Sequence, residues 1–130
     1  MMNPVVHFEM PYRDRERAAA FDPAAFGWQT QRLGPEMGDY LLVTTAVSDV
    51  RPGAPAGAIN GGMFPFKPDW PAQHPAVVIG VEDIRAAMAR VSAAGGSVLG
   101  EPMEIPGVGQ YLAFTDTEGN RNSLLEPLMA

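Results

Sequence analysis

The chain has 130 residues, enough for one domain that buries a core without cross-links, and it contains no cysteine, which excludes disulfides and thiol chemistry. Fifteen acidic residues against nine basic ones give a net charge of −6, which argues against a nucleic-acid partner because phosphate binding needs a basic face. Residues 1–6 carry no basic stretch, and no segment approaches the roughly 20 apolar residues of a membrane span. A cytoplasmic protein that binds neither nucleic acid nor membrane is expected.

The first predicted element is a strand over residues 5–10, where apolar and polar residues alternate. Alternation puts His7 and Glu9 on one face of this strand and Phe8 and Met10 on the other. The proline that follows is expected to end the strand.

A helix is predicted to begin after Asp14, whose side-chain oxygen can accept from the free amides of a first helical turn. Pro23 is expected to break or restart this helix near Asp22, because proline lacks the backbone N–H that a helix interior uses. Strands are then expected over residues 28–33 and 40–45, separated by a Gly-Pro turn.

The middle of the chain is rich in proline and glycine. Residues 48–57 form a Pro/Gly-rich excursion that leads to Ala-Ile-Asn-Gly-Gly at 58–62, whose glycines suit a strand that another group approaches closely. Prolines then recur too often for a helix or a central strand, which indicates a linker over about residues 65–75.

The second half repeats this order more cleanly. A strand at residues 77–81 precedes Asp83, which is predicted to cap a helix that Gly95-Gly96 ends. The apolar face of this helix carries Ile84, Met88 and Val91. Three strands are expected to follow, over residues 97–99, 110–115 and 122–125.

An internal repeat connects the two halves. VVHFEMPYRDRERAAAF near the start returns as AVVIGVEDIRAAMARV, with Asp14 and Asp83 lying 69 residues apart. Gly-Asp-Tyr-Leu at 38–41 matches Gly-Gln-Tyr-Leu at 109–112 with the offset grown to 71. We expect a single domain over residues 1–130 whose two copies share one core. Its parts are module one (about 4–64), the linker (about 65–75) and module two (about 76–128).

The order of elements is repeated, and the chain contains an HFEM start, an AFGW step, an INGG strand and a DTEGN turn. Together these features resemble the vicinal oxygen chelate superfamily. Within it the chain is most similar to the glyoxalase/bleomycin-resistance/dioxygenase-like proteins. The resemblance implies an α+β fold in which two tandem βαβββ modules form an open half-barrel cleft.

Active members of that family hold a divalent metal at four positions, one on the first and one on the last strand of each copy. Counting by the repeat places these positions at His7, Ala76, Ser123 and Gly61, the last if Gly57 is aligned with Gly119. One histidine cannot hold such an ion tightly, so we expect neither the family's metal site nor a cofactor in this chain. A divalent metal remains an alternative only through His74 or Glu126.

Without a metal site, only a few side chains remain as candidates for catalysis or substrate binding. His7 and Glu9 are the candidate catalytic residues, because a histidine and a carboxylate two apart on a strand point the same way. The alternative is that His7 is a relic of an ancestral ligand and Glu9 a structural carboxylate. Candidate substrate-binding residues, with core packing as the alternative for the aromatic ones, are Trp28, Tyr40, Asn60, Tyr111 and Ser123.

Two functions follow from the resemblance. One is a glyoxalase-like lyase, isomerase or dioxygenase-related enzyme acting on a small molecule without the usual metal site. The alternative is a metal-free binding protein of the bleomycin-resistance type that sequesters a drug or metabolite. Phe64, Phe66 and Trp70 in the linker can close over the cleft or bury against a second copy, and the homodimer is favoured because an exposed apolar patch is a liability.

Overall fold

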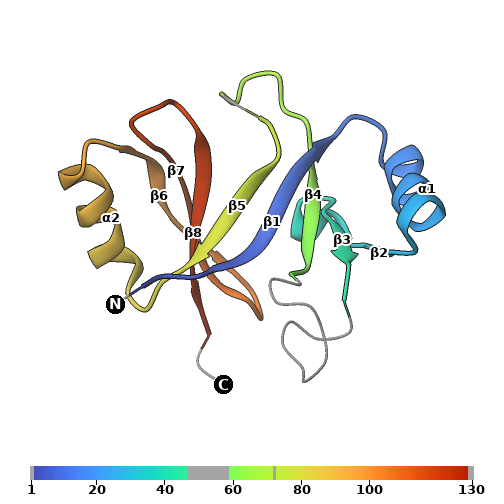
Figure 1. Cartoon of the computed structure of the whole chain (residues 1–130), viewed down its shortest axis with the longest axis horizontal. Coiled ribbons are helices and arrows are strands. Elements are labelled where there is room, and N and C mark those ends of the chain that lie inside the picture. The colour runs from blue at the N-terminus through green and yellow to red at the C-terminus, as the bar shows by residue number, and fades with distance from the viewer. Residues whose placement is uncertain (1, 47–58, 72, 129–130) are drawn as a thin grey trace. The chain divides into compact units, whose positions relative to one another are not determined.

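The computed structural model describes residues 2–46, 59–71 and 73–128, and it confirms an α+β fold built from two βαβββ modules (Figure 1). The predicted excursion at residues 48–57 lies outside the described residues. The chain divides into two compact units, His7–Pro75 and Met1–Val6 with Ala76–Ala130. We call these the first-repeat unit and the second-repeat unit.

The elements of the first repeat are β1 (Val5–Tyr12), α1 (Arg15–Phe26), β2 (Gln29–Arg32), the 3-10 helix η1 (Pro35–Met37), β3 (Leu41–Thr44) and β4 (Gly61–Pro65). Those of the second repeat are β5 (Ala76–Gly80), α2 (Ile84–Ala93), β6 (Ser97–Ile105), β7 (Gly109–Thr115) and β8 (Arg121–Pro127). No helix of the described residues is long and apolar enough to cross a membrane.

In the first-repeat unit the strands lie in the order β2, β3, β4, β1. The pairs β2–β3 and β3–β4 are antiparallel, whereas β1 and β4 run parallel with Phe8 opposite Gly61. The core of this unit is a buried cluster of Ala19, Leu41, Val43 and Met63, with Phe8, Met10, Tyr12, Ala18 and Trp28 packed against it.

The second-repeat unit has the corresponding order β5, β8, β7, β6. β5 and β8 are parallel, with Val78 opposite Ser123, and the other pairs are antiparallel. Its core cluster is Val81, Ile84, Ala87, Leu112, Phe114 and Leu124. Each unit thus has a buried apolar cluster of its own, and the single domain with a shared core stays a prediction.

β1 is longer than predicted, because Pro11 does not end it and the strand runs to Tyr12. The reason is the register of β1 on β4. Phe8 donates its N–H to the Asn60 carbonyl, and Phe66 donates its N–H to the Tyr12 carbonyl, so the even-numbered residues of β1 bond to β4. Pro11 is odd-numbered, and the N–H that it lacks would not have joined this ladder.

α1 also continues where a break was predicted. Pro23 lies inside the helix and removes the N–H that would have bonded to the Ala19 carbonyl. The Thr30 hydroxyl at the start of β2 donates to that carbonyl instead, at 3.2 Å. The helix ends at Gly27, whose φ of 72° is the left-handed conformation that glycine adopts without strain. An acceptor from outside the helix therefore lets α1 tolerate its proline.

We predict that Thr30→Val lowers the free energy of unfolding by about 1 kcal/mol, because the Ala19 carbonyl then loses its donor in a buried setting. Ala19 is 6% exposed, so water replaces that donor poorly. Denaturant unfolding measures the change, with Thr30→Ser, which keeps the hydroxyl, as the matched control. Equal stability of the two variants would contradict this account of Pro23.

α2 follows its prediction closely. Asp83 caps it by accepting from the N–H groups of Arg85 and Ala86, and Ile84 is buried. β6, in contrast, continues well past its predicted end at residue 99. Gly100 and Pro102 lie within it, and a register shift against β7 between Leu99 and Met103 accommodates them, as a β-bulge does.

Candidate functional site

The predicted pair on β1 is joined by a tyrosine from the residue before β3. Tyr40 donates its hydroxyl hydrogen to Glu9 Oε2 at 2.8 Å. The His7 Nε2 atom lies 3.0 Å from the same hydroxyl oxygen. Because the one phenolic hydrogen points to Glu9, His7 must donate from Nε2, and the imidazole carries its proton there. The three side chains therefore form one bridge, His7–Tyr40–Glu9.

Gly62 on β4 lies beneath the tyrosine ring. A Cβ atom built on Gly62 would overlap the Tyr40 ring, whereas one built on Gly61 would overlap the ring of Phe8 in the core. The two glycines thus face opposite sides of the strand, and Gly62 faces the bridge. This confirms the expectation that these glycines mark a strand that other groups approach closely.

The register of the strands corrects one position in the repeat. Leu42 of β3 lies opposite Gly62, and its counterpart Ala113 of β7 lies opposite Ser123. Likewise Glu9 pairs with Gly62, as Val78 pairs with Ser123. The counterpart of Ser123 is therefore Gly62 and not Gly61. The sequence alignment was wrong by one residue because it matched turn glycines, while hydrogen-bond register fixes the true equivalence.

The second-repeat unit places a tyrosine at the corresponding point. Ser123, which is 4% exposed, donates its hydroxyl to the hydroxyl of Tyr111 at 2.6 Å. Tyr111 is the repeat partner of Tyr40. In each unit, then, a tyrosine at the same place in the repeat contacts the position on the last strand that the family uses for a metal ligand.

The donor set does not fit the four-ligand metal centre that the resemblance implied. With the corrected register the four positions hold His7, Ala76, Gly62 and Ser123. The Tyr40 ring fills the space over Gly62, and the Ser123 hydroxyl bonds to Tyr111. Among the described residues no group of three His, Cys, Asp or Glu side chains could hold a metal ion. We therefore derive no step through a metal, and the expectation of no cofactor stays a prediction.

The two alternative ligands have other positions. Glu126 accepts the N–H of Ile84 at 2.9 Å through Oε1, so it caps α2 together with Asp83. His74 is exposed and precedes β5, which begins at Ala76, so the early strand start that would have aligned it is absent. Within its own unit, neither Glu126 nor His74 lies where it could replace a missing metal ligand.

Two predicted binding residues make structural contacts within the first-repeat unit. Trp28 packs with Phe8 and Phe26 at ring-centroid distances of 6.1 and 5.3 Å, on the core side of β1. Asn60 accepts the N–H groups of Thr45 and Ala46 through Oδ1, at 2.8 and 3.1 Å. Both arrangements serve structure, and substrate contact by Trp28 and Asn60 stays a prediction.

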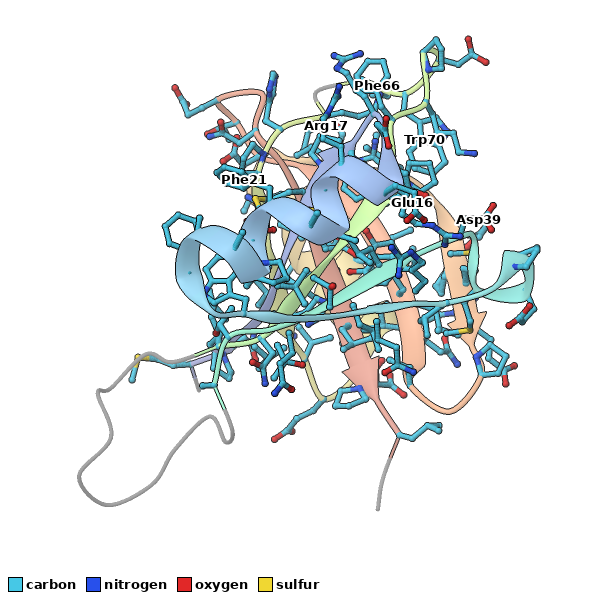
Figure 2. The ribbon with its side chains drawn as sticks, turned by 90° about the vertical axis from the view of Figure 1, so that its right-hand side faces the viewer. Glu16, Arg17, Phe21, Asp39, Phe66 and Trp70 are labelled. Atoms are coloured by element: carbon cyan, nitrogen blue, oxygen red, sulfur yellow. The ribbon has the colours of Figure 1, made fainter. Side chains whose placement is uncertain are left out.

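The linker aromatic residues pack within the first-repeat unit. Phe64 and Trp70 have ring centroids 6.4 Å apart, and the Arg13 guanidinium lies 4.0 Å from the centre of the Phe66 ring. Figure 2 shows the labels of Phe66 and Trp70 on the side where α1 begins, while Phe21 lies further along this helix. Trp70 remains 46% exposed. The homodimer predicted from these side chains stays a prediction.

Sequence reasoning missed two features of this unit. It did not place Tyr40 between His7 and Glu9, although the tyrosine recurs in both repeats and that recurrence was a usable signal. It also treated Asp22 only as a helix boundary, whereas the structure buries this carboxylate. No sequence pattern indicated that burial.

Comparison with known proteins places the chain in a family. The sequence profile of the Glyoxalase/Bleomycin resistance protein/Dioxygenase superfamily matches residues 5–124. A protein of Mycobacterium tuberculosis named "Putative glyoxylase CFP32" is 39% identical over 69 residues, which are 53% of this chain and 26% of that protein. A glyoxylase-like domain-containing protein of Didymella fabae is 29% identical over 119 residues, covering 89% of this chain and 88% of that protein. The stretch matched in the mycobacterial relative is thus about a quarter of its length.

Solved structures agree on the fold. A methylmalonyl-CoA epimerase of Streptomyces coelicolor superposes with a TM-score of 0.71 at 18% identity, covering 100% of this chain and 98% of that one. A hypothetical protein of Bacillus halodurans C-125 gives a TM-score of 0.70 at 13% identity, covering 100% and 98%. At such identities the likeness establishes the fold alone.

Proposed function

The chain belongs to the Glyoxalase/Bleomycin resistance protein/Dioxygenase superfamily, and we propose that it is a glyoxalase-like lyase or isomerase in which Glu9 removes a proton from a small oxygenated substrate. The observation that carries the proposal is the bridge in which the Tyr40 hydroxyl joins Glu9 to His7, at 2.8 and 3.0 Å. A general base must be held in one orientation, and two hydrogen bonds on the bridging hydroxyl supply that constraint.

The chemistry balances without an added reagent. Glu9 takes a proton from a carbon next to a carbonyl group, whose oxygen receives the electron pair, and the proton returns to the same carbon. Where that carbon carries a hydroxyl group, the proton can instead return to the former carbonyl carbon, while the hydroxyl proton passes to the former carbonyl oxygen and a new carbonyl group forms. Tyr40 holds the carboxylate, and His7 fixes the hydroxyl through its Nε2 hydrogen. These roles require only side chains of the first-repeat unit.

A dioxygenase is less well supported, because the residues at the four ligand positions supply one strong ligand. Oxygen chemistry in the usual form needs a redox metal held by several side chains. The donor set of His7, Ala76, Gly62 and Ser123 is poorly suited to that task. Proton transfer by a carboxylate places no such demand on the site.

Exchange of substrate hydrogen for deuterium tests the proposal. Purified protein in D2O is mixed with small α-hydroxyketones, thiol adducts of α-ketoaldehydes and acyl thioesters, and NMR follows the signal of the hydrogen next to the carbonyl. We expect catalysed exchange in at least one class, lost in Glu9→Gln. If exchange survives in Glu9→Gln, the assignment of Glu9 as base is wrong.

A metal-free binding protein for cationic small molecules is the second candidate, favoured by the net charge of −6. Two measurements taken together separate the two candidates. Thermal-shift screening that finds a cationic ligand, combined with the absence of exchange in all three substrate classes, would replace the enzyme proposal by the binding proposal.

A further inference from the structure

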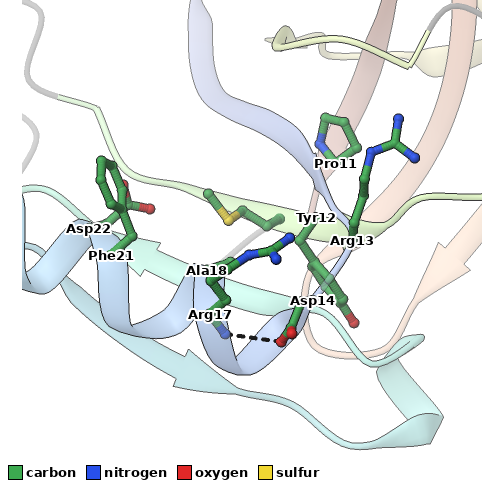
Figure 3. Close-up of a pocket in the computed structure, with 9 residues that line it drawn as sticks. Pro11, Tyr12, Arg13, Asp14, Arg17, Ala18, Phe21 and Asp22 are labelled. Carbon is green, nitrogen blue, oxygen red and sulfur yellow. Dashed lines mark hydrogen bonds between the residues drawn. The ribbon is translucent and has the colours of Figure 1, made fainter.

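The first-repeat unit contains a pocket of about 300 Å³ beside α1 that the proposed reaction does not use (Figure 3). It is lined by α1, the residues that precede it and one side chain of β4. The lining residues are Pro11, Tyr12, Arg13, Asp14, Arg17, Ala18, Phe21, Asp22 and Met63. None of His7, Tyr40 and Glu9 is among them, so this pocket is distinct from the bridge.

Asp22 is the unusual residue of this pocket. The residue is 5% exposed, and its Oδ2 atom is buried without a hydrogen-bond partner. Burial raises the pKa of this carboxyl above its ordinary value. A buried oxygen without a hydrogen-bond partner destabilises the folded state. Asp22 does not offset this cost by capping α1, because the capping residue of this helix is Asp14, which accepts the Arg17 N–H. The fold therefore holds an unsatisfied acceptor against a cavity.

The rest of the pocket is divided between apolar walls and a basic end. Phe21, Ala18 and Met63 supply apolar surface. Figure 3 shows Phe21 and Asp22 at one end and Pro11 and Arg13 at the other. The Arg13 guanidinium is held over the Phe66 ring at 4.0 Å. The pocket thus offers a carboxyl group at one end and a guanidinium group at the other, with the Arg17 side chain and apolar surface between them.

We propose that this pocket binds a small organic ammonium compound that carries a carboxylate at the far end of a short apolar chain. The ammonium group donates to the Asp22 carboxylate, the chain lies against Phe21 and Met63, and the carboxylate meets the Arg13 end, while Arg17 adds positive charge between the two ends. The volume is at the lower limit of ordinary ligand pockets, which restricts the compound to about the size of an amino acid.

Calorimetry on the full chain with three probes tests the ligand class. We expect 6-aminohexanoate to bind more tightly than hexylamine, and hexanoate to bind least. The first comparison measures the carboxylate at the arginine end, and the second measures the ammonium at Asp22. Equal affinity of all three probes, or no binding of either amine, would overturn the proposal.

The variant Asp22→Asn tests whether Asp22 is the residue that binds the ammonium group. We expect this variant to bind both amines at least about tenfold more weakly, since a charge-assisted hydrogen bond is lost. The variant should fold, because it removes a buried charge. Asp69→Asn, which changes an exposed carboxyl outside the pocket, is the matched control and should leave affinity unchanged. Unchanged amine affinity in Asp22→Asn would show that the amines bind elsewhere.

The pH dependence of binding gives a second measurement. Burial raises the pKa of Asp22, so this carboxyl becomes protonated as the pH is lowered, and the affinity for hexylamine, which has no carboxylate of its own, should fall. The other charged or titratable side chains lining the pocket are Tyr12, Arg13, Asp14 and Arg17. Loss of this pH dependence in Asp22→Asn is expected, and its persistence would contradict the assignment. Because Glu9→Gln does not touch this pocket, amine binding and proton exchange can fail separately.

Discussion

Glu9→Gln is expected to slow substrate proton exchange by about 10²–10⁴-fold, the range by which a positioned general base accelerates proton transfer. Glutamine keeps the size of the side chain and can still accept from the Tyr40 hydroxyl, so the fold should be unchanged. Its amide cannot take up a proton at neutral pH. The loss should therefore appear in the exchange rate, with the free energy of unfolding nearly constant.

Two further variants separate the base from the bridge that positions it. Glu104→Gln changes an exposed carboxyl on β6 and is the matched control, so it should exchange at the wild-type rate. Tyr40→Phe removes the shared hydroxyl while keeping the ring over Gly62. We expect an intermediate rate in this variant, because Glu9 remains present but is no longer held. A rate in Tyr40→Phe equal to that of wild type would exclude a positioning role for the bridge.

Gly62→Ala tests the packing beneath the bridge by adding one methyl group. The Tyr40 ring occupies that space, so we expect a loss of about 1–3 kcal/mol in the free energy of unfolding, as for other overpacked sites. The backbone of Gly62 is not among those with positive φ, so its conformation alone would accept alanine. Steric overlap is therefore the expected cause.

A double-mutant cycle with Tyr40→Ala measures that overlap. Without the ring, Gly62→Ala should cost nothing or stabilise slightly, since alanine restricts the unfolded chain more than glycine does. Additive effects of the two substitutions would show that the ring and the glycine are not coupled. NMR of the His7 ring in Gly62→Ala gives a separate check, because a displaced Tyr40 changes its hydrogen bond.

The features that were predicted correctly depend on neighbours in the sequence. Alternation along β1 placed His7 and Glu9 on one face, and each aspartate cap at 14 and 83 was recognisable from the helix that follows. Both properties are set within a few residues of chain. The repeat added the order of elements, because it showed the same local signals twice.

The features that were missed depend on distant partners. Pro23 was predicted to break α1, and the helix survives because the Thr30 hydroxyl replaces the lost donor to Ala19. The equivalence of Gly62 with Ser123 required the hydrogen-bond register, which turn glycines did not reveal. Such contacts are fixed by tertiary packing, so a single sequence contains no local pattern for them.

The two tyrosines explain how the repeat has changed at its last strands. Tyr40 covers Gly62, and Tyr111 bonds to Ser123, so each unit presents a phenol where the family's metal ligand would project. In both copies a tyrosine therefore contacts the last-strand position at which the family resemblance implies a metal ligand. This is consistent with a site that works through held protons.

Removal of a fully buried leucine should produce the largest loss of stability. Leu41 and Leu112 occupy equivalent places in the two repeats and are 0% and 2% exposed. We expect Leu41→Ala and Leu112→Ala each to lower the free energy of unfolding by about 2–5 kcal/mol, because each leaves a cavity in its own core cluster. Leu128→Ala, at a side chain 61% exposed, is the control and should change little.

The same variants test whether the two units unfold together. Both tryptophans, Trp28 and Trp70, belong to the first-repeat unit, so tryptophan fluorescence follows that unit alone while far-ultraviolet circular dichroism follows both. We expect one transition, because β1 contributes residues to both units and each unit is small for independent stability. Leu112→Ala should then shift the fluorescence midpoint as far as the dichroism midpoint. An unchanged fluorescence midpoint would show instead that each repeat folds on its own core cluster.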